Sequence, residues 1–424
     1  MNIAILGYGV EGESVYNYYH AKYPDATFTA YDNKLEPKNE LPDGVKFVGG
    51  VTDFKGITAD LAFKTPPIAP WDVEVTGKVT SVTREFLKNC PAPVIGVTGT
   101  KGKGTTSSMI TSILNAAGKK TWLVGNIGVS AFDVLPQISA DDIVVYELSS
   151  FQLWDADVSP HIAVVLGIEP EHLDVHKDFN DYVQAKSNIA KHQHEDDEVI
   201  YKEGNEWSEE IAQMSPGEAV PYLLNKGAFV SEGYFYYQRH KLCPTSVLQI
   251  PGQHNIENAC AAIAATWSWV QDPEVIARGL HDFKGLSYRI ELVRELDGVS
   301  YYNDSYSTAS AATNVALSAL DRPTVLIAGG YDRGYGYEEM ANVIKTHQNI
   351  LKVLLIGETG SKIAEHLDKG IFELSGSLDD TTKRAHDLAR AGSVVLLSPG
   401  FASFDMFTNF TERGRQFTEV VNAL

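Results

Sequence analysis

The chain has 424 residues, more than a single hydrophobic core usually serves, so two or three domains are expected. Its formal net charge of −20 makes nucleic acid an unfavourable partner, and no stretch approaches the roughly 20 apolar residues that a membrane-spanning helix needs. No signal peptide is visible, and the three cysteines, Cys90, Cys243 and Cys260, have no metal-binding or redox spacing, which favours a reducing cytoplasm.

The N-terminal residues predict a nucleotide-binding unit. An apolar strand that begins at Asn2 runs into a G-x-G-x-x-G sequence at Gly7–Gly12, and a helix is expected over roughly 15–23. A second strand at 27–32 ends in Asp32, about 20 residues after the last glycine, where Rossmann units place an acid near a ribose. The pattern favours a nucleotide-binding fold over a tight strand–helix turn without a ligand, and it does not specify the nucleotide.

Alternating strands and helices restart after a proline-rich join at 89–94 and again after 283–289. Strands are predicted at Val94–Thr98, Trp122–Val124, Ile143–Glu147, Ile162–Ile168, Thr324–Ala328, Val353–Ile356 and Val394–Leu397. This order predicts an α/β protein of three domains with mostly parallel sheets, covering residues 1–90, 91–284 and 285–424. The first and third domains would be Rossmann-like, and the central one would resemble a P-loop ATPase.

The sequence VTGTKGKGTT forms a glycine-rich loop between a predicted strand and a predicted helix. The backbone amides of Gly99–Gly104 can point inward at a phosphate, and the following helix directs its positive end to the same place. Lys103 can reach the β- and γ-phosphates of a nucleotide. A Walker loop has Ser or Thr directly after this lysine, whereas here Gly104 follows, so the oxygen for magnesium would come from Thr105 or Thr106. A surface turn is disfavoured by the strand and helix on either side.

Further candidates follow the next predicted strands. Glu147 ends a strand at the edge that faces the ligand crevice in open α/β sheets, where a carboxylate can hold the magnesium of a nucleotide. An ordinary surface acid is the alternative. The next strand leads to a polar loop that carries His172, Asp174 and His176, and a helix then places Lys186. Taken without further context, Lys186 is interpreted as an ordinary surface lysine.

Several segments occur in the order in which the Mur ligases carry them. They are TGTKGKGTT, GNIG (125–128), ELSSFQ (147–152), EHLDVH…AK (171–186), GQHNIEN (252–258), NDSYST (303–308), GGYDRG (329–334) and SPGFASFDMFTNFTERG (398–414). Over nearly its whole length the sequence resembles this family of three-domain, ATP-dependent amide ligases of peptidoglycan synthesis. Its compact N-terminal Rossmann unit and its C-terminal motif are most similar to the members that add D-glutamate.

The resemblance implies a role for each of the three domains. The first would bind UDP-N-acetylmuramoyl-L-alanine, the second ATP and two Mg²⁺ ions, and the third the incoming D-glutamate. The substrate carboxylate would attack the γ-phosphate to give an acyl phosphate, and the amine of the amino acid would then displace phosphate. Such a transfer between anions depends mainly on neutralising and positioning charge. A cytoplasmic monomer is expected, with no nucleic-acid partner and no membrane span.

The resemblance also implies which residues act. The catalytic set would be Lys103, Asn126, Glu147, His172 and Lys186. ATP would contact Gly99, Thr100, Lys101, Gly102, Lys103, Gly104, Thr105, Asn255, Asn258, Arg289 and Asp304. The UDP-linked substrate would contact Gly7, Gly9, Val10, Glu11, Gly12, Asp32, Asn33, Lys34, Thr65, Asn126 and Gln152. The amino acid would contact Thr308, Arg333, Ser403 and Phe410.

Two metal sites are implied in the same way. Thr105 and Glu147 would hold the first Mg²⁺, and His172 with a carbamylated Lys186 would hold the second. An ammonium group cannot bind a cation. Carbon dioxide added to the neutral amine gives a carbamate, whose anionic oxygens suit magnesium.

The sequence departs from the family pattern at a few positions. Gly104 follows the loop lysine, Tyr306 replaces a usual lysine, Arg333 stands where lysine is common, and Thr65-Pro66-Pro67-Ile68 replaces Ser-Pro-Gly. The alternatives are another Mur or folylpolyglutamate-type ligase, a dinucleotide-dependent oxidoreductase and a non-catalytic nucleotide-binding regulator. An oxidoreductase leaves the P-loop unexplained, and the N-terminal Rossmann unit argues against a folate ligase.

Overall fold

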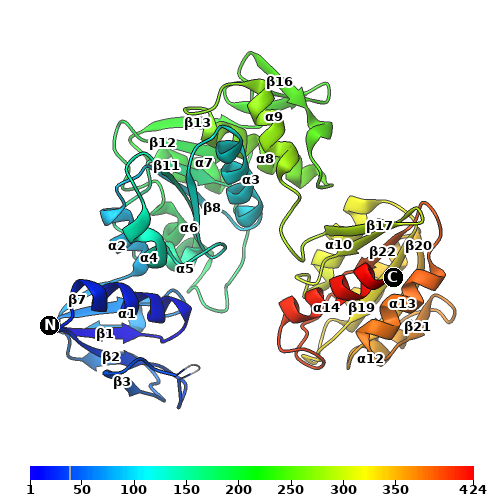
Figure 1. Cartoon of the computed structure of the whole chain (residues 1–424), viewed down its shortest axis with the longest axis horizontal. Helices are drawn as coiled ribbons and strands as arrows, with labels where there is room; N and C mark the ends of the chain where they lie inside the picture. Colours follow the sequence, from blue (N-terminus) through cyan, green and yellow to red (C-terminus); the bar gives the residue numbers. More distant parts are fainter. Residues whose placement is uncertain (38–39) are drawn as a thin grey trace. The chain divides into compact units, whose positions relative to one another are not determined.

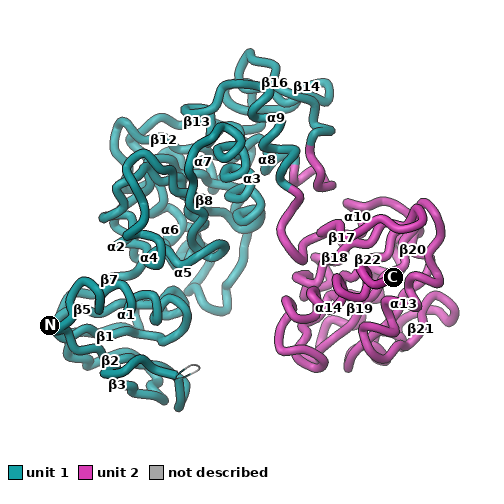
Figure 2. Tube along the Cα trace, in the orientation of Figure 1, with its two compact units in different colours: residues 1–247, 256–283 teal, residues 248–255, 284–424 magenta. Residues whose placement is uncertain are grey.

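The computed structural model describes residues 1–37 and 40–424, and the chain divides into two compact units (Figure 2). Unit 1 comprises residues 1–247 and 256–283, and unit 2 comprises residues 248–255 and 284–424. Strands and helices alternate through both units (Figure 1), which confirms the α/β class with mostly parallel sheets. The expected domain limits at 90/91 and 284/285 stay predictions.

The first sheet of unit 1 carries the N-terminal glycine loop. Its five strands have the order β3-β2-β1-β5-β7 and are all parallel, while β4 and β6 form a separate pair. The elements are β1 (Asn2–Leu6), α1 (Val10–Lys22), β2 (Thr27–Tyr31), β3 (Val45–Val48), β4 (Phe54–Ile57), β5 (Leu61–Lys64), a 3-10 turn (Pro70–Asp72), β6 (Val73–Val75), β7 (Lys78–Thr80) and α2 (Val82–Asn89). Helix α1 begins at Val10, inside the glycine motif and earlier than expected, with Gly9 as its N-cap.

The second sheet of unit 1 carries the P-loop. Its six parallel strands have the order β13-β12-β11-β8-β10-β9, so β8 lies between β10 and β11. The strands are β8 (Val94–Thr98), β9 (Thr121–Gly125), β10 (Ile143–Glu147), β11 (Ile162–Val165), β12 (Glu198–Lys202) and β13 (Glu218–Tyr222). A small antiparallel sheet follows, made of β14 (Ala228–Ser231), β15 (Tyr234–Tyr237) and β16 (His240–Pro244).

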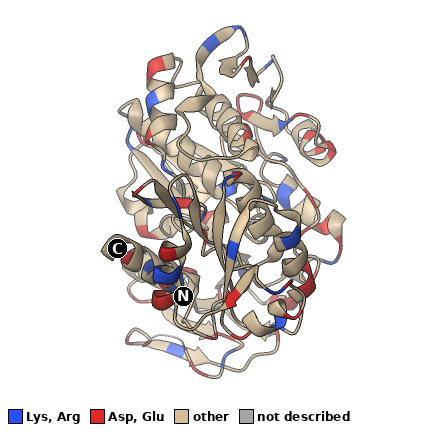
Figure 3. Cartoon of the chain, turned by 90° about the vertical axis from the view of Figure 1, so that its right-hand side faces the viewer, with Lys and Arg blue, Asp and Glu red and all other residues tan. Residues whose placement is uncertain are grey.

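Helices surround this second sheet. They are α3 (Lys103–Ala116), α4 (Ala131–Val134), α5 (Ser150–Leu153), α6 (Phe179–Ser187), α7 (Glu206–Gln213), α8 (Gln253–Thr266) and α9 (Pro273–Asp282), with 3-10 turns at Leu135–Gln137 and Thr245–Val247. The alanine-rich run in α8 is buried from Ala259 to Ala265. Within the described ranges, no helix has both the length and the apolar character needed to cross a membrane. Figure 3 shows basic and acidic residues interspersed along the ribbon rather than gathered into one basic stretch.

Unit 2 contains a third sheet with the order β17-β18-β22-β19-β20-β21, in which only β17 and β18 pair antiparallel. Its strands are β17 (Glu291–Leu296), β18 (Val299–Asn303), β19 (Thr324–Gly329), β20 (Ile350–Ile356), β21 (Phe372–Leu374) and β22 (Val394–Leu397). Its helices are α10 (Ser310–Leu320), α11 (Tyr337–Thr346), α12 (Gly360–Ala364), α13 (Leu378–Leu388) and α14 (Phe410–Ala423).

Both faces of the third sheet are covered. Successive residues of a strand point to opposite faces, so Leu326 and Ala328 belong to a hydrophobic cluster with α10 and α11. Val325 and Ile327 belong to a second cluster with α13 and α14. Because helices bury both faces, the open positions are at the carboxyl edge, where the connecting loops lie.

Candidate active site

The N-terminal glycine loop connects β1 to α1 at the carboxyl edge of the first sheet. Gly7 has a φ of +84°, and a Cβ atom there would lie 2.2 Å from the Oγ1 atom of Thr65, so only glycine fits. A Cβ atom at Gly12 would lie 2.7 Å from the carbonyl oxygen of Gly7, so α1 packs closely on the loop. The loop therefore brings the positive end of α1 to the sheet edge, where a phosphate can bind.

Asp32 holds the shape of this loop. Its carboxylate accepts hydrogen bonds from the backbone N–H groups of Tyr8 at 2.8 Å and of Lys34 at 3.0 Å. The side chains of Asn33 and Lys34 are exposed, and Val10 is exposed at the start of α1. Asp32 therefore fixes the backbone next to the predicted substrate contacts Asn33 and Lys34.

A cluster of charged and polar side chains joins α1 to the segment after β10. The Nε2 atom of the buried Gln152 donates to the Oε1 atom of Glu11 at 3.5 Å. Lys64 is also buried, donates to the carbonyl oxygen of Ile68 at 3.1 Å and lies 3.7 Å from the carboxylate of Asp155. Burial raises the pKa of Glu11 to about 7, although Gln152 and Lys64 act in the opposite direction. Sequence reasoning included Glu11 and Gln152 but missed Lys64.

The P-loop runs from β8 into α3 and depends on two glycines. Gly102 caps α3 with a φ of +86°, and a Cβ atom there would lie 2.5 Å from the Oδ1 atom of Asn258. Gly99 has a φ of +147°, and its Cβ atom would lie 2.6 Å from the Cβ atom of Leu166. Glycine is therefore required at both positions, and Asn258, a predicted ATP contact, lies against the loop.

Lys103 is the first residue of α3, and its ammonium group lies over the loop. Its Nζ atom donates to the carbonyl oxygens of Gly99 at 3.1 Å and of Thr100 at 2.9 Å. Lys101 is exposed, and its Nζ atom lies 3.8 Å from the carboxylate of Glu169. Of the two loop lysines, Lys103 is therefore held at the centre and Lys101 faces outward.

Two threonines follow Gly104 in the first turn of α3. Thr105 is partly exposed, whereas Thr106 is fully buried. The hydroxyl group of Thr106 has no hydrogen-bond partner among the residues that the structure describes. Thr105 is therefore the hydroxyl that a ligand at the loop can reach.

Glu147 and Asn126 meet at the same edge of the second sheet. Glu147 ends β10, where its register partners are Val97 of β8 and Gly125 of β9. Its side chain is buried, and its carbonyl oxygen accepts a bond from the N–H group of Asn126 at 3.4 Å. Because β8 leads directly into the P-loop, this register brings Glu147 to the sheet edge that carries the P-loop.

Lys186 lies against the P-loop and is 1% exposed, so its interpretation as a surface lysine is wrong. The Nζ atom donates to the carbonyl oxygen of Gly99 at 2.8 Å and to the Oγ1 atom of Thr98 at 3.4 Å, and it lies 4.6 Å above the ring of Tyr182. Burial, and next to it the charge of Lys103, lowers the pKa of Lys186 well below the ordinary value. A neutral amine is the form that reacts with carbon dioxide, so this environment fits a carbamate.

The two histidines of the loop between β11 and α6 differ in whether a ligand can reach their ring nitrogens. His176 is buried, with Nδ1 2.8 Å from the carboxylate of Asp181 and Nε2 3.0 Å from the hydroxyl of Ser150, so the protein uses both ring nitrogens. His172 is exposed, and its ring lies 5.0 Å from that of Phe151. His172 is therefore the histidine that a ligand can reach.

The predicted metal ligands come from separate elements around the P-loop. In the described part of the chain, no group of three or more His, Cys, Asp or Glu side chains could hold a metal ion by itself. The chemistry of the set fits Mg²⁺ nonetheless, because Glu147 and a carbamate on Lys186 would supply anionic oxygens and Thr105 a hydroxyl. Phosphate oxygens would have to complete the coordination.

The remaining predicted ATP contacts lie in unit 2. Asp304 follows β18 and is buried, and it accepts bonds from the N–H group of Ile290 at 3.2 Å and the hydroxyl of Ser398 at 2.7 Å. Burial raises the pKa of Asp304 to about 6, against hydrogen bonds and the charge of Arg289. The side chain of Asn255 donates to the carbonyl oxygen of Pro251 at 2.5 Å.

The predicted amino-acid contacts lie on three loops of unit 2. Thr308 and Arg333 are exposed, Ser403 is buried, and Phe410 is partly buried at the start of α14. Arg333 makes no ion pair within residues 1–37 and 40–424, whereas the adjacent Asp332 pairs with other side chains of unit 2. A guanidinium that is exposed and not in an ion pair can bind a carboxylate.

Arg413 is a residue whose role the sequence did not indicate, although the C-terminal motif contains it. It is 1% exposed, and its guanidinium donates to the carbonyl oxygens of Phe401, Ala402 and Ser305 at 3.1, 3.3 and 2.9 Å. Its Nε atom donates to the hydroxyl of Ser305 at 3.0 Å. Arg413 thus joins the loop after β22, which carries Ser403, to the loop after β18.

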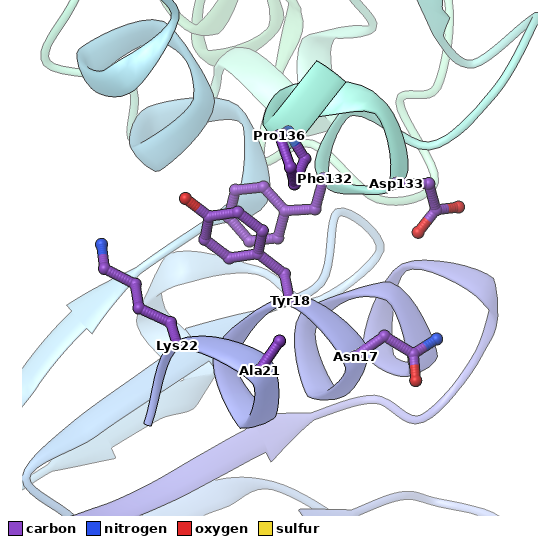
Figure 4. Close-up of a pocket in the computed structure, with 7 residues that line it drawn as sticks. All are labelled: Asn17, Tyr18, Ala21, Lys22, Phe132, Asp133 and Pro136. Carbon is purple, nitrogen blue, oxygen red and sulfur yellow. The ribbon is translucent and has the colours of Figure 1, made fainter. Parts of the chain in front are cut away.

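A surface pocket of about 470 Å³ lies elsewhere in unit 1, between α1 and α4 (Figure 4). It is lined by Asn17, Tyr18, Ala21, Lys22, Phe132, Asp133 and Pro136, and the rings of Tyr18 and Phe132 stack at 4.7 Å. The Oγ atom of Ser14 also donates to Asp133 at 2.7 Å, which fixes the two helices. None of the predicted site residues lines this pocket.

Comparisons with known proteins give a consistent result. Residues 97–266 match the Mur ligase middle domain, and residues 288–401 match the Mur ligase, glutamate ligase domain. The UDP-N-acetylmuramoylalanine–D-glutamate ligase of Clostridium acetobutylicum is 37% identical, covering 99% of this chain and 96% of its own length. The enzyme of the same name from Acetivibrio thermocellus is 36% identical, with 100% and 96% covered.

Solved structures show the same fold. A MurF structure from Acinetobacter baumannii has a TM-score of 0.66 at 16% identity, covering 99% of this chain and 93% of its own. The MurF ligase of Thermotoga maritima in complex with ADP has a TM-score of 0.61 at 16% identity, with 99% and 94% covered. Because these likenesses extend over almost the whole chain, they support the three-domain architecture.

Proposed function

The chain belongs to the Mur ligase family, and we propose that it is the ATP-dependent ligase that adds D-glutamate to UDP-N-acetylmuramoyl-L-alanine. The observation that carries this proposal is the convergence of Lys103, Glu147 and Lys186 at the carboxyl edge of the second sheet. They come from three separate segments and combine a cation, a buried carboxylate and an amine of lowered pKa. The full-length likeness to ligases named for D-glutamate supports the choice of amino acid.

The P-loop would bind the phosphates of ATP. The amides of Gly99–Gly104 and the N-terminal end of α3 would face the phosphates, and Lys103 would leave its loop carbonyls to bind the β- and γ-phosphates. Asn258 lies against the same loop, and Asn255, Arg289 and Asp304 would contact the rest of the nucleotide. The substrate carboxylate, oriented by Asn126 and the N-terminal glycine loop, would then attack the γ-phosphate in line.

Two Mg²⁺ ions, when bound, would neutralise the charge that spreads over the transferring phosphoryl group. Thr105 and Glu147 would hold one ion, and His172 with carbamylated Lys186 would hold the other. Lys186 can take up carbon dioxide because its burial favours the neutral amine. The carbonyl oxygen of Gly99 can still accept a hydrogen bond from the remaining N–H group of the modified side chain.

The amino acid would bind in unit 2. Arg333 can give two parallel N–H bonds to a carboxylate of glutamate, and Ser403 and Thr308 can add neutral hydrogen bonds. Phe410 can cover the methylene groups. A diamino acid carries a cation at its far end, which Arg333 would repel.

The test is phosphate release from ATP with UDP-N-acetylmuramoyl-L-alanine and a panel of amino acids. D-Glutamate should release phosphate in proportion to the ligated product, and L-glutamate, L-lysine and diaminopimelate should release little. Release with a folate acceptor would identify a folylpolyglutamate-type ligase, and nucleotide binding without release would identify a regulator. Either result would overturn the proposal.

We further propose that the enzyme acts in the cytoplasm as a monomer. The three cysteines are free thiols, of which Cys243 and Cys260 are buried, and this suits a reducing compartment. Sedimentation of the purified chain at micromolar concentration tests the monomeric state.

A further inference from the structure

The ring of Tyr306 lies between two residues that belong to different predicted subsites. The Cζ atom of Arg289, a predicted ATP contact, lies 3.7 Å from the centre of this ring. The ring of Phe410, the predicted wall of the amino-acid subsite, meets it at 5.1 Å with an angle of 84° between the planes. One aromatic side chain therefore touches both predicted subsites, with Arg289 over its face and Phe410 in a T-shaped contact.

The backbone under this ring is firmly held. The N–H group of Tyr306 donates to the carbonyl oxygen of Tyr288 at 3.0 Å. The preceding residue, Ser305, donates through its N–H group to the Oδ1 atom of Asn303 at 3.2 Å and receives bonds from the buried Arg413. The ring itself is 43% exposed, so its place depends on these backbone bonds and on its two neighbours.

A guanidinium stacked on an aromatic face is held by the ring quadrupole and by contact area. Removal of the ring leaves the long side chain of Arg289 free to occupy many rotamers, and a nucleotide would then have to order it. Removal also takes away the T-shaped contact that supports Phe410. Phenylalanine keeps the aromatic face and edge, whereas leucine keeps only part of the volume.

We propose that Tyr306 is a positioning residue that holds Arg289 for the nucleotide and Phe410 for the amino acid, so that both affinities depend on one ring. The inference rests on the proposed function, because it uses the roles assigned there to Arg289 and Phe410. It adds a role for Tyr306 that is argued from its stacked contact with Arg289 and its T-shaped contact with Phe410.

The test compares Tyr306→Leu and Tyr306→Phe with the matched control Tyr234→Leu. Tyr234 lies in β15, where the Nζ atom of Lys241 is 3.5 Å from its ring centre, so this control removes a similar cation–π pair outside the site. ATP affinity is measured by calorimetry without acceptor, and the KM for the amino acid by phosphate release. Circular dichroism and the Tm show whether each variant folds.

We expect Tyr306→Leu to weaken ATP binding by about threefold to tenfold, the range of a partly exposed cation–π pair, and to raise the KM of the amino acid as well. Tyr306→Phe and Tyr234→Leu should change both values by less than about twofold. In an Arg289→Gln background, Tyr306→Leu should weaken ATP binding no further. Unchanged ATP affinity in folded Tyr306→Leu, or full additivity with Arg289→Gln, would overturn the proposal.

Failure of the proposed function gives a different result. If the chain is not a D-glutamate ligase, the unmodified protein fails to release phosphate with D-glutamate, whatever residue stands at 306. The ATP measurement needs no acceptor and no turnover, so it reports on the Tyr306–Arg289 pair independently. An effect on ATP binding with an unchanged amino-acid KM would refute the link to Phe410.

Discussion

The Nζ atom of Lys186 lies 2.8 Å from the carbonyl oxygen of Gly99, so a lysine of α6 is buried against the first glycine of the P-loop. Lys103, the first residue of α3, donates to the same carbonyl oxygen at 3.1 Å. Two amines thus share one acceptor. Mutual repulsion and burial both favour loss of a proton from the more deeply buried one, which is Lys186.

Lys186→Ala should lower the ligation rate on the order of a hundredfold, because the second metal would lose its anionic ligand. Added formate should restore part of the activity by supplying a carboxylate. Lys191→Ala, at an exposed position after the same helix, serves as the control and should be near normal. Carbon-13 NMR of the active protein in labelled bicarbonate should show a carbamate signal that Lys186→Ala lacks, and a free amine in the active state would contradict this.

Lys103→Ala should lower the ligation rate on the order of a thousandfold while leaving the fold intact, because it removes a cation from the transferring phosphate. Lys119→Ala is the control, since Lys119 is an exposed lysine just after the far end of the same helix. Single-turnover phosphate release measures both variants. Near-normal turnover by a folded Lys103→Ala protein would refute the assignment.

Thr105→Ala should raise the magnesium concentration needed for half-maximal activity, because Thr105 is the reachable hydroxyl at the start of α3. Thr106→Val should leave this requirement unchanged. It should also leave the free energy of unfolding unchanged or raise it slightly, since it replaces a buried hydroxyl that lacks a partner among the described residues. Magnesium titrations and urea unfolding distinguish the two threonines, and equal small effects on the titrations would count against Thr105.

Glu11 should make stability depend on pH. Burial raises its folded-state pKa to about 7 from 4.5, so the folded chain keeps a proton that the unfolded chain releases between these values. Its contribution to stability is therefore fully present below about pH 4.5 and is lost as the pH rises through about 7.

As the pH rises from 5 to 8, the free energy of unfolding of Glu11→Gln should therefore increase by about 2 kcal/mol relative to that of the unmodified protein. Glu13→Gln, in the same helix but exposed, should follow the unmodified protein. Urea unfolding at both pH values provides the free energies. Parallel behaviour of the two variants would show that Glu11 does not titrate as inferred.

Arg333→Ala should raise the KM for glutamate at least about tenfold and leave the KM for ATP nearly unchanged, because the lost bonds go to a carboxylate of the amino acid. Arg333→Lys keeps the charge but not the paired donors, so its KM for glutamate should lie between that of the unmodified enzyme and that of Arg333→Ala. Steady-state kinetics with each substrate varied in turn provides both constants. Coupling of lysine or diaminopimelate by the unmodified enzyme would reject this role.

Much of the arrangement around the P-loop could be predicted from the sequence. The glycine spacing, the lysine and the strand that ends in Glu147 are local patterns, and the parallel register of β8 and β10 then brings them together. The burial of Lys186 could not be predicted in this way. It depends on how α6 packs against the P-loop, and the local sequence of a polar helix contains no signal for that contact.

Other features were missed for different reasons. Strands β12, β13 and β16 contain charged or proline residues, so none of them forms the continuous apolar run that marks β8 or β22. Lys64 ends an apolar strand, where a lysine ordinarily faces solvent, yet it is buried with the carbonyl oxygen of the nearby Ile68 and the distant carboxylate of Asp155 as partners. Such partners become visible only once the chain is folded.

The arginine at 413 limits how the loops that carry the predicted amino-acid contacts can be redesigned. Because one guanidinium joins the backbone of Phe401 and Ala402 to that of Ser305, the two loops form a single frame. The exposed side chain of Thr308 projects from this frame and takes no part in the bonds to Arg413, whereas Arg333 lies on the separate loop after β19. A loop grafted alone from a relative would break the shared bonds, so graft design has to transfer both loops and their arginine as a set.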